Sequence, residues 1–229
     1  MRFFLVILFL FSIASPPLSF AQSREIAFEI VMDDLGVLTD AADAEQYKLS
    51  MLGHLKALNN IRRFSQARID VISTSYGRSM WIGSPRDLNS PRAAELLDYI
   101  QPNPDQCNNL EGAFKALEAN LEQLDRQGYE EVYILVFSSL IDTPRPCGDI
   151  VNLHLPQLPP PLDMEAILTG RETLKAINFY WVNPHQRAVW NEFLSPAIDH
   201  SSQNDIPFGL FDIENTRFEL DEGIQGVSR

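Results

Sequence analysis

The residues from Val132 to Phe137 (VYILVF) form an apolar run without a charged position. A strand that is apolar on both faces must be covered on both sides, which is typical of a central strand in a parallel sheet. Before this run, apolar residues recur at helical spacing, at Leu110, Ala113, Phe114, Leu117, Leu121 and Leu124. Asn108 or Asn109 is the expected N-cap of that helix, and Gly128 is its expected end. A helix that leads directly into a buried strand predicts an α/β fold.

Further strand and helix patterns alternate along the chain. Short apolar or alternating segments predict strands at 26–32, 68–75, 80–82, 177–182 and 207–213. Helices are predicted from Asp40 or Asp43 to about 61, from 91 to about 100, from 163 to about 176, and from 186 to 194. In 26–32 we expect the even-numbered residues on one face and the odd-numbered ones on the other. The alternation predicts a three-layer α/β sandwich of Rossmann type, in which helices flank a mostly parallel sheet.

Residues 1–21 have the pattern of a secretory signal peptide. Arg2 precedes an apolar run of about 12 residues from Phe3 to Ala14, and Ser19 and Ala21 supply small residues at a cleavage site. The run is too short to cross a bilayer of about 30 Å as a helix, although an uncleaved anchor is the alternative. We therefore expect export to the periplasm or the medium, one domain over 22–218, and a flexible tail over 219–229.

Charge and cysteine content exclude several classes of protein. The formal net charge is −13, from 18 Lys and Arg against 31 Asp and Glu. Such a chain is repelled by nucleic-acid phosphates and by anionic membrane surfaces, so neither is an expected partner. The two cysteines are too few for a multi-cysteine zinc or iron–sulfur site.

In an α/β sheet, ligands bind beyond the carboxyl ends of the strands. The loops expected at that edge are 33–43, 102–109 and 138–161, and the last belongs to a proline-rich loop insert over 142–163. Long loops in compact domains are usually functional. These three loops are therefore where we expect a functional site.

Several local strings resemble the von Willebrand factor A domain. In that family the first strand ends in Asp-x-Ser-x-Ser, a Thr precedes a later helix, and a central strand ends with Asp. Together these residues hold a magnesium or manganese ion at the top of the sheet. The matching strings here are Val31–Val37 (VMDDLGV), Cys107–Phe114 (CNNLEGAF) and Ile134–Ser139 (ILVFSS), and the resemblance spans roughly 25–213. It implies a von Willebrand factor A-like fold.

The metal-binding positions of the family are altered in this chain. Asp33 stands at the first ligand position, but Leu35 and Val37 replace the two serines. Asn108 stands in place of the Thr, and Ser139 in place of the Asp. A hard divalent cation needs about six oxygen ligands, so the resemblance implies a degenerate site and no cofactor. Asp33 is the ligand that would remain in a residual site.

An improvised cation site is the alternative that this comparison leaves open. Its ligands would be Asp33, Asp34, Asn108 and Asp142. The simpler interpretation of Asp33 and Asp34 is a polar strand end whose side chains accept backbone N–H groups.

The resemblance also bears on Cys107 and Cys147, because it places their loops at the same edge of the sheet. A disulfide bond between them would close a loop of about 40 residues and contribute roughly 4 kcal/mol in the chain-entropy model. Two free thiols are the alternative, although pairing is the usual outcome in an oxidising compartment.

A second resemblance predicts an enzyme. Ile30–Gly36 (IVMDDLG) also looks like the strand end of divergent polysaccharide deacetylases, and Leu153–Pro156 (LHLP) is similar to their histidine segment. In such a metal-dependent hydrolase Asp33 would act as base and His154 as metal ligand. The four histidines, however, include no closely spaced pair.

We favour an exported, non-enzymatic protein–protein interaction module of the cell envelope, with a subunit of a secretion or surface assembly as its candidate role. The expected partner is an envelope protein. The residues expected to face it lie in the three loops: Asp33, Asp34, Asn108, Asn109, Ser139 and Asp142.

Overall fold

The structure is a computed structural model that describes residues 25–33, 41–89, 91–99, 107–143, 154–212 and 215–216. Its strands are β1 (Ile26–Met32), β2 (Arg68–Ser73), β3 (Arg78–Gly83), β4 (Glu131–Phe137), β5 (Leu174–Val182) and β6 (Phe208–Asp212). Its helices are α1 (Ala41–Ala57), α2 (Pro91–Tyr99), α3 (Leu110–Gln127), α4 (Met164–Leu168), α5 (Pro184–Phe193) and α6 (Ser195–Gln203), with short 3₁₀ turns η1 (Leu58–Asn60) and η2 (Asp87–Asn89).

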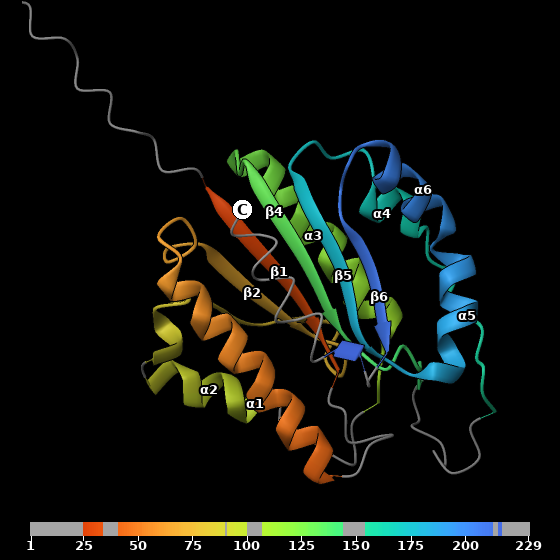
Figure 1. The fold of residues 1–229 in the computed structure, drawn as a ribbon, viewed down its shortest axis with the longest axis horizontal. Helices are drawn as coiled ribbons and strands as arrows, with labels where there is room; N and C mark the ends of the chain where they lie inside the picture. Colours follow the sequence, from red (N-terminus) through yellow and green to blue (C-terminus); the bar gives the residue numbers. More distant parts are fainter. Residues whose placement is uncertain are drawn as a thin grey trace, which may run out of the picture.

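The strands form one sheet in the order β3-β2-β1-β4-β5-β6. Every neighbouring pair is parallel except β2 and β3, which are antiparallel. Figure 1 shows α1 and α2 on one face of this sheet and α3 on the other. The predicted α/β class, with a mostly parallel sheet between helices, is confirmed.

The two faces of β1 separate the molecule into two cores, as its alternating sequence predicts. Ile26, Phe28, Ile30 and Met32 pack with buried residues of α1 and α2. Ala27 and Val31 pack with the apolar stripe of α3 and with α4, α5 and α6. All seven residues of β1 are buried, because helices cover the strand on both sides.

Helix α3 has the ends that its sequence predicts. The Asn109 side chain accepts a hydrogen bond from the Gly112 amide at 2.8 Å, and Gly128 closes the helix with a left-handed φ of 80°. The six apolar residues of its stripe are all buried. This helix positions the residues 107–109 that precede it.

The structure differs from the sequence prediction at three elements. The helix expected over 163–176 ends at Leu168, and β5 begins at Leu174, because Gly170 turns the chain with a φ of 74°. The strand expected over 68–75 ends at Ser73, where a turn to Gly77 begins. Helix α6 was not predicted, since Pro196 suggests a helix stop but lies here in a first turn.

Several sequence predictions fall on residues outside the described ranges. These are the signal peptide over 1–21, the tail over 219–229, Asp34, Leu35, Val37 and Cys147. In the part of the chain that the structure describes, no helix combines the length and the apolar character needed to cross a bilayer.

Candidate functional site

The carboxyl ends of β1 and β4 meet at Asp33, which directly follows β1. One carboxylate oxygen of Asp33, Oδ2, accepts hydrogen bonds from Ser138 Oγ at 2.9 Å and from Ser139 Oγ at 2.9 Å. The same oxygen accepts a bond from the Ser139 amide at 2.7 Å. Asp33 is only 2% exposed. Its buried charge is therefore stabilised by the β4 loop rather than presented to solvent.

The loop after β4 is fixed by residues of α5. Leu140 has a φ of 60°, an unusual conformation for a residue with a side chain. Its carbonyl oxygen accepts hydrogen bonds from Gln186 Nε2 at 2.9 Å and Trp190 Nε1 at 3.0 Å. Because both donors are buried side chains of one helix, they hold the strained turn in place.

Asn108 and Asp142 join the start of α3 to the same loop. The Asn108 side chain donates to the Ile141 carbonyl, and its main-chain oxygen accepts from the Thr143 amide. The Asp142 carboxylate accepts a hydrogen bond from the Leu110 amide at 3.0 Å, at the first turn of α3. Burial raises the pKa of Asp142 above its usual value; the Leu110 bond opposes this rise, and the charge of Glu111 adds to it.

The structure thus brings Asp33 together with Ser139, and Asn108 together with the loop that holds Asp142. The burial of Asp33, Asn108 and Ser139, which are 2%, 6% and 7% exposed, corrects their assignment as partner-facing residues. Their side chains hold the loops by internal hydrogen bonds. Asn109 is exposed and Asp142 is partly exposed, so a contact role for these two residues stays a prediction.

Two large side chains that the sequence prediction missed are exposed at this edge. Leu158 is 86% exposed. Its neighbour Gln157 is hydrogen-bonded through both its side chain and its backbone amide. The Gln157 side chain accepts from the Asp142 amide at 3.1 Å, and its own amide donates to Gln186 Oε1 at 2.6 Å. Tyr76, in the turn after β2, is 45% exposed.

The turn that carries Tyr76 lies against the start of α3. A Cβ atom on Gly77 would approach the Gly112 backbone to 3.3 Å. Gly77 also has a φ of 60°, so glycine suits this contact on both counts. A glycine after an aromatic residue at a strand end is the sequence signal that was available for this turn.

The described residues do not form a cation site of the family type. Among them, no group of three or more His, Cys, Asp or Glu residues is placed to bind a metal ion. Asp33 Oδ2 is occupied by the two serines, and Asp142 caps α3. The buried oxygens Asn108 Oδ1 and Thr74 Oγ1 have no hydrogen-bond partner. Both are uncharged, whereas a hard divalent cation also needs negatively charged oxygen ligands.

The remaining sequence candidates are Cys107 and His154. Cys107 is buried beside the start of α3, and its proposed partner Cys147 lies outside the described residues, so the disulfide stays a prediction. His154 is exposed, whereas Asp33 is buried. Within the described ranges no hydrogen bond or ion pair joins these two residues. The arrangement therefore lends no geometric support to an Asp33–His154 hydrolase.

No protein-family model matches this sequence, and no curated protein matches it at a significant level. Among solved structures, a D319A mutant of the PilB minor pilin from Streptococcus sanguinis has a TM-score of 0.53 and 13% identity, over 90% of this chain and 62% of that chain. The pilus adhesin SpaC from Lactobacillus rhamnosus GG has a TM-score of 0.49 and 8% identity, over 90% of this chain and 30% of that chain. This chain thus spans less than two thirds of either protein. At such identities the likeness to the minor pilin shows a related fold and nothing of activity.

Proposed function

We propose that this chain is an exported, non-enzymatic protein–protein interaction module of the cell envelope, with a von Willebrand factor A-like fold that acts without a metal ion. The observation that carries the proposal is the bonding of Asp33. This residue stands at the first metal-ligand position of the family that the sequence resembles. Its Oδ2 is instead bonded by Ser138 and Ser139, and Ser139 stands where the family has its Asp.

The related fold of a minor pilin supports a surface role. We infer a place as a subunit of a surface or secretion assembly, with an envelope protein as partner. The signal peptide expected over 1–21 supports export by an independent argument, since it depends on sequence alone.

We place the partner contact on a loop surface made of Tyr76, Asn109, Asp142 and Leu158. Leu158 combines 86% exposure with a neighbouring residue fixed by hydrogen bonds to two other segments. Because the adjacent backbone is held by these bonds, the segment loses little backbone entropy on binding, which suits an anchor residue of an interface. Tyr76 adds a partly exposed aromatic ring in the turn that lies against the start of α3.

The experiment that tests this proposal is cross-linking of the purified chain in an envelope extract. We compare the wild type with a Leu158→Ser, Tyr76→Ser double variant. Leu49→Ser is the matched control, because Leu49 is 57% exposed but lies on α1. We expect one cross-linked partner for the wild type and the control, and its loss in the double variant.

The proposal fails if all three proteins capture the same set of partners, or if none is captured by the wild type. Circular dichroism of each variant checks that the fold is retained. Both substitutions replace exposed side chains, so we expect changes within about 0.5 kcal/mol in the free energy of unfolding.

A further inference from the structure

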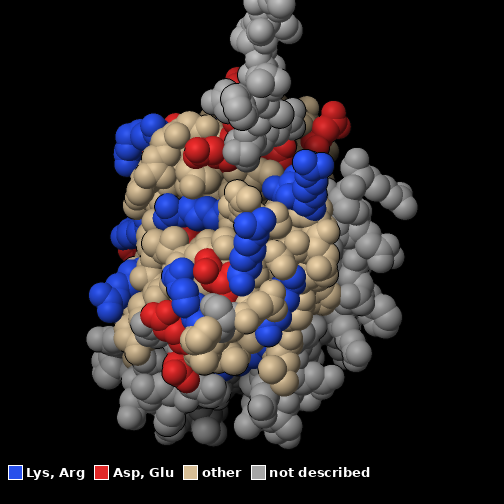
Figure 2. Space-filling view, turned by 90° about the vertical axis from the view of Figure 1, so that its left-hand side faces the viewer, with Lys and Arg blue, Asp and Glu red and all other residues tan. Residues whose placement is uncertain are grey.

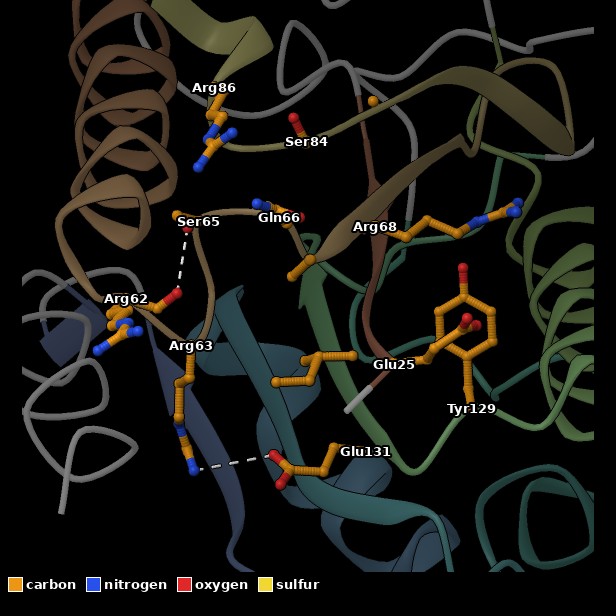
Figure 3. A pocket seen from close by; sticks show the side chains of 13 residues that line it. Glu25, Arg62, Arg63, Ser65, Gln66, Arg68, Ser84, Arg86, Tyr129 and Glu131 are labelled. Carbon is orange, nitrogen blue, oxygen red and sulfur yellow. Dashed lines mark hydrogen bonds and ion pairs between the residues drawn. The ribbon is translucent and has the colours of Figure 1, made fainter. Parts of the chain in front are cut away.

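A pocket of about 880 Å³ lies at the edge of the sheet opposite the loop surface. It is formed where β1, β2 and β4 begin and where the antiparallel strand β3 ends, together with the turn that precedes β2. Figure 3 shows the side chains that line it. The loop surface lies at the other ends of β1, β2 and β4, so the two regions are separated by the length of these strands.

The lining of this pocket has the opposite charge to the chain as a whole. It contains four arginines, Arg62, Arg63, Arg68 and Arg86, and two acids, Glu25 and Glu131. The complete chain has 18 basic residues against 31 acidic ones. Figure 2 shows basic side chains gathered on the side of the molecule that carries β2 and α1. A local basic excess in an acidic protein is a candidate site for an acidic partner.

Two of the four arginines are bound within the protein and fix the walls of the pocket. Arg63 donates to Tyr133 Oη at 3.2 Å, and its guanidinium lies 4.3 Å from the centre of the Phe64 ring. Arg68 donates to Asp70 Oδ2 at 2.9 Å. Phe64 is fully buried against Phe28 and Tyr133, so the turn that carries Arg62 and Arg63 is anchored in the core.

The other two arginines, Arg62 and Arg86, are not held by internal contacts of this kind. Within the described residues, the guanidinium groups of Arg62 and Arg86 make no hydrogen bond or ion pair, and both residues are exposed. Figure 3 shows them on the same side of the pocket, above and below Ser65. Like charges held near one another repel unless an anion lies between them. The Nε atom of Arg68 is also buried without a partner.

We propose that this arginine pocket (Arg62, Arg63, Arg68 and Arg86) binds an acidic peptide segment of a partner protein, with carboxylates of the segment paired to Arg62 and Arg86. The guanidinium group matches a carboxylate through two parallel hydrogen bonds. Sites for small organic ligands are lined mostly by apolar side chains, whereas Ile26 and Ala67 are the aliphatic side chains in this lining. A polyphosphate carries a denser negative charge than a peptide with one carboxylate per residue, so Glu25 and Glu131 disfavour the polyphosphate more strongly.

The test uses fluorescence anisotropy of a labelled peptide of alternating Asp and Glu flanked by Gly-Ser, at low and at physiological ionic strength. We expect saturable binding by the wild-type chain. We expect the Arg62→Gln, Arg86→Gln double variant to bind at least about tenfold more weakly, which corresponds to about 1.4 kcal/mol. Arg126→Gln, Arg187→Gln is the matched control, because it removes the same charge from arginines paired with Glu122 and Asp212.

Three results would overturn the proposal. These are no binding of the acidic peptide by the wild type, equal weakening in both double variants, and displacement of the peptide by inorganic phosphate at a similar concentration. The last result would indicate a small-anion site instead. The Leu158→Ser, Tyr76→Ser chain must bind the peptide as the wild type does, because the arginine pocket does not depend on the loop surface. Failure of one proposal is therefore distinguishable from failure of the other.

Discussion

Glu29 offers the sharpest test of the electrostatics of this fold, because it is a carboxylic acid buried in the middle of the sheet. It lies on the face of β1 that packs against α3, directly beside Asp70 of β2 in the strand register. Both residues are 0% exposed. Asn120 of α3 donates a hydrogen bond to Glu29 Oε2 at 2.9 Å, and Glu29 Oε1 has no partner.

This environment raises the pKa of Glu29 from 4.5 to about 8. Burial is the main cause, and the neighbouring charge of Asp70 adds to it; the hydrogen bond from Asn120 and the charge of Arg68 act in the opposite direction. A tenfold change in proton affinity corresponds to about 1.4 kcal/mol, so ionisation of Glu29 in the folded protein costs on the order of 5 kcal/mol. The folded state binds this proton more tightly than the unfolded state. The contribution of Glu29 to stability is therefore complete below about pH 4.5 and is lost as the pH rises to about 8.

Glu29→Gln removes this dependence, because glutamine keeps the shape and never ionises. We expect the free energy of unfolding of the variant, relative to the wild type, to increase by at least about 2 kcal/mol between pH 5 and pH 9. Urea denaturation followed by circular dichroism at pH 5, 7 and 9 measures the difference. Titrating groups far from Glu29 act equally on both proteins and cancel.

Glu172→Gln is the control, since Glu172 is an exposed acid. The difference between this variant and the wild type gives the baseline for replacing a surface carboxylate. A pH-independent difference between Glu29→Gln and the wild type would refute the argument, because it would mean that Glu29 titrates alike in the folded and unfolded chains.

Three further predictions concern the carboxyl edge of the sheet. Gln186→Ala should lower the free energy of unfolding by about 1–3 kcal/mol, measured in urea, because it leaves the Gln157 amide without its acceptor. Cys107→Ser should lower the free energy of unfolding by roughly 4 kcal/mol, because it removes the expected disulfide bond. Peptide mapping of the wild type without reductant should find Cys107 linked to Cys147, and two unmodified thiols would contradict the pairing. Neither EDTA nor MgCl₂ should change the melting temperature if Asp33 binds no metal, and a magnesium-dependent rise that Asp33→Ala abolishes would disprove the metal-free proposal.

The fold was predictable where one signal dominated the local sequence. The alternation of 26–32 assigned each residue of β1 to its face, and the expected caps at Asn108 or Asn109 and at Gly128 bounded α3 to within one residue. Competing signals produced the errors. Between 163 and 176 the apolar residues suit one helix, but Gly170 interrupts the pattern and the second half pairs with β4 instead. Long-range strand pairing overrides local helical spacing at such a point.

The candidate site was predictable in its location but not in its contacts. The rule that strand ends meet at one edge placed Asp33 and Ser139 together, as the structure has them. The rule does not say which of these side chains form hydrogen bonds within the protein and which remain open to a partner. The roles of Gln157 and Gln186 depend on two segments about thirty residues apart, and no local pattern in the sequence relates them.

The two edges of the sheet differ in how they use charge, and this difference separates the two proposed contacts. At the carboxyl edge Asp33 is buried and hydrogen-bonded and Asp142 is only partly exposed, so the most exposed large side chains of the loop surface are the uncharged Leu158 and Tyr76. At the amino edge the arginines outnumber the acids that line the same pocket. Salt screens charge pairs near a surface but does not weaken the burial of apolar groups. Binding at the arginine pocket must therefore fall as ionic strength rises, while binding through the loop surface must persist, so that salt alone assigns a partner to one edge.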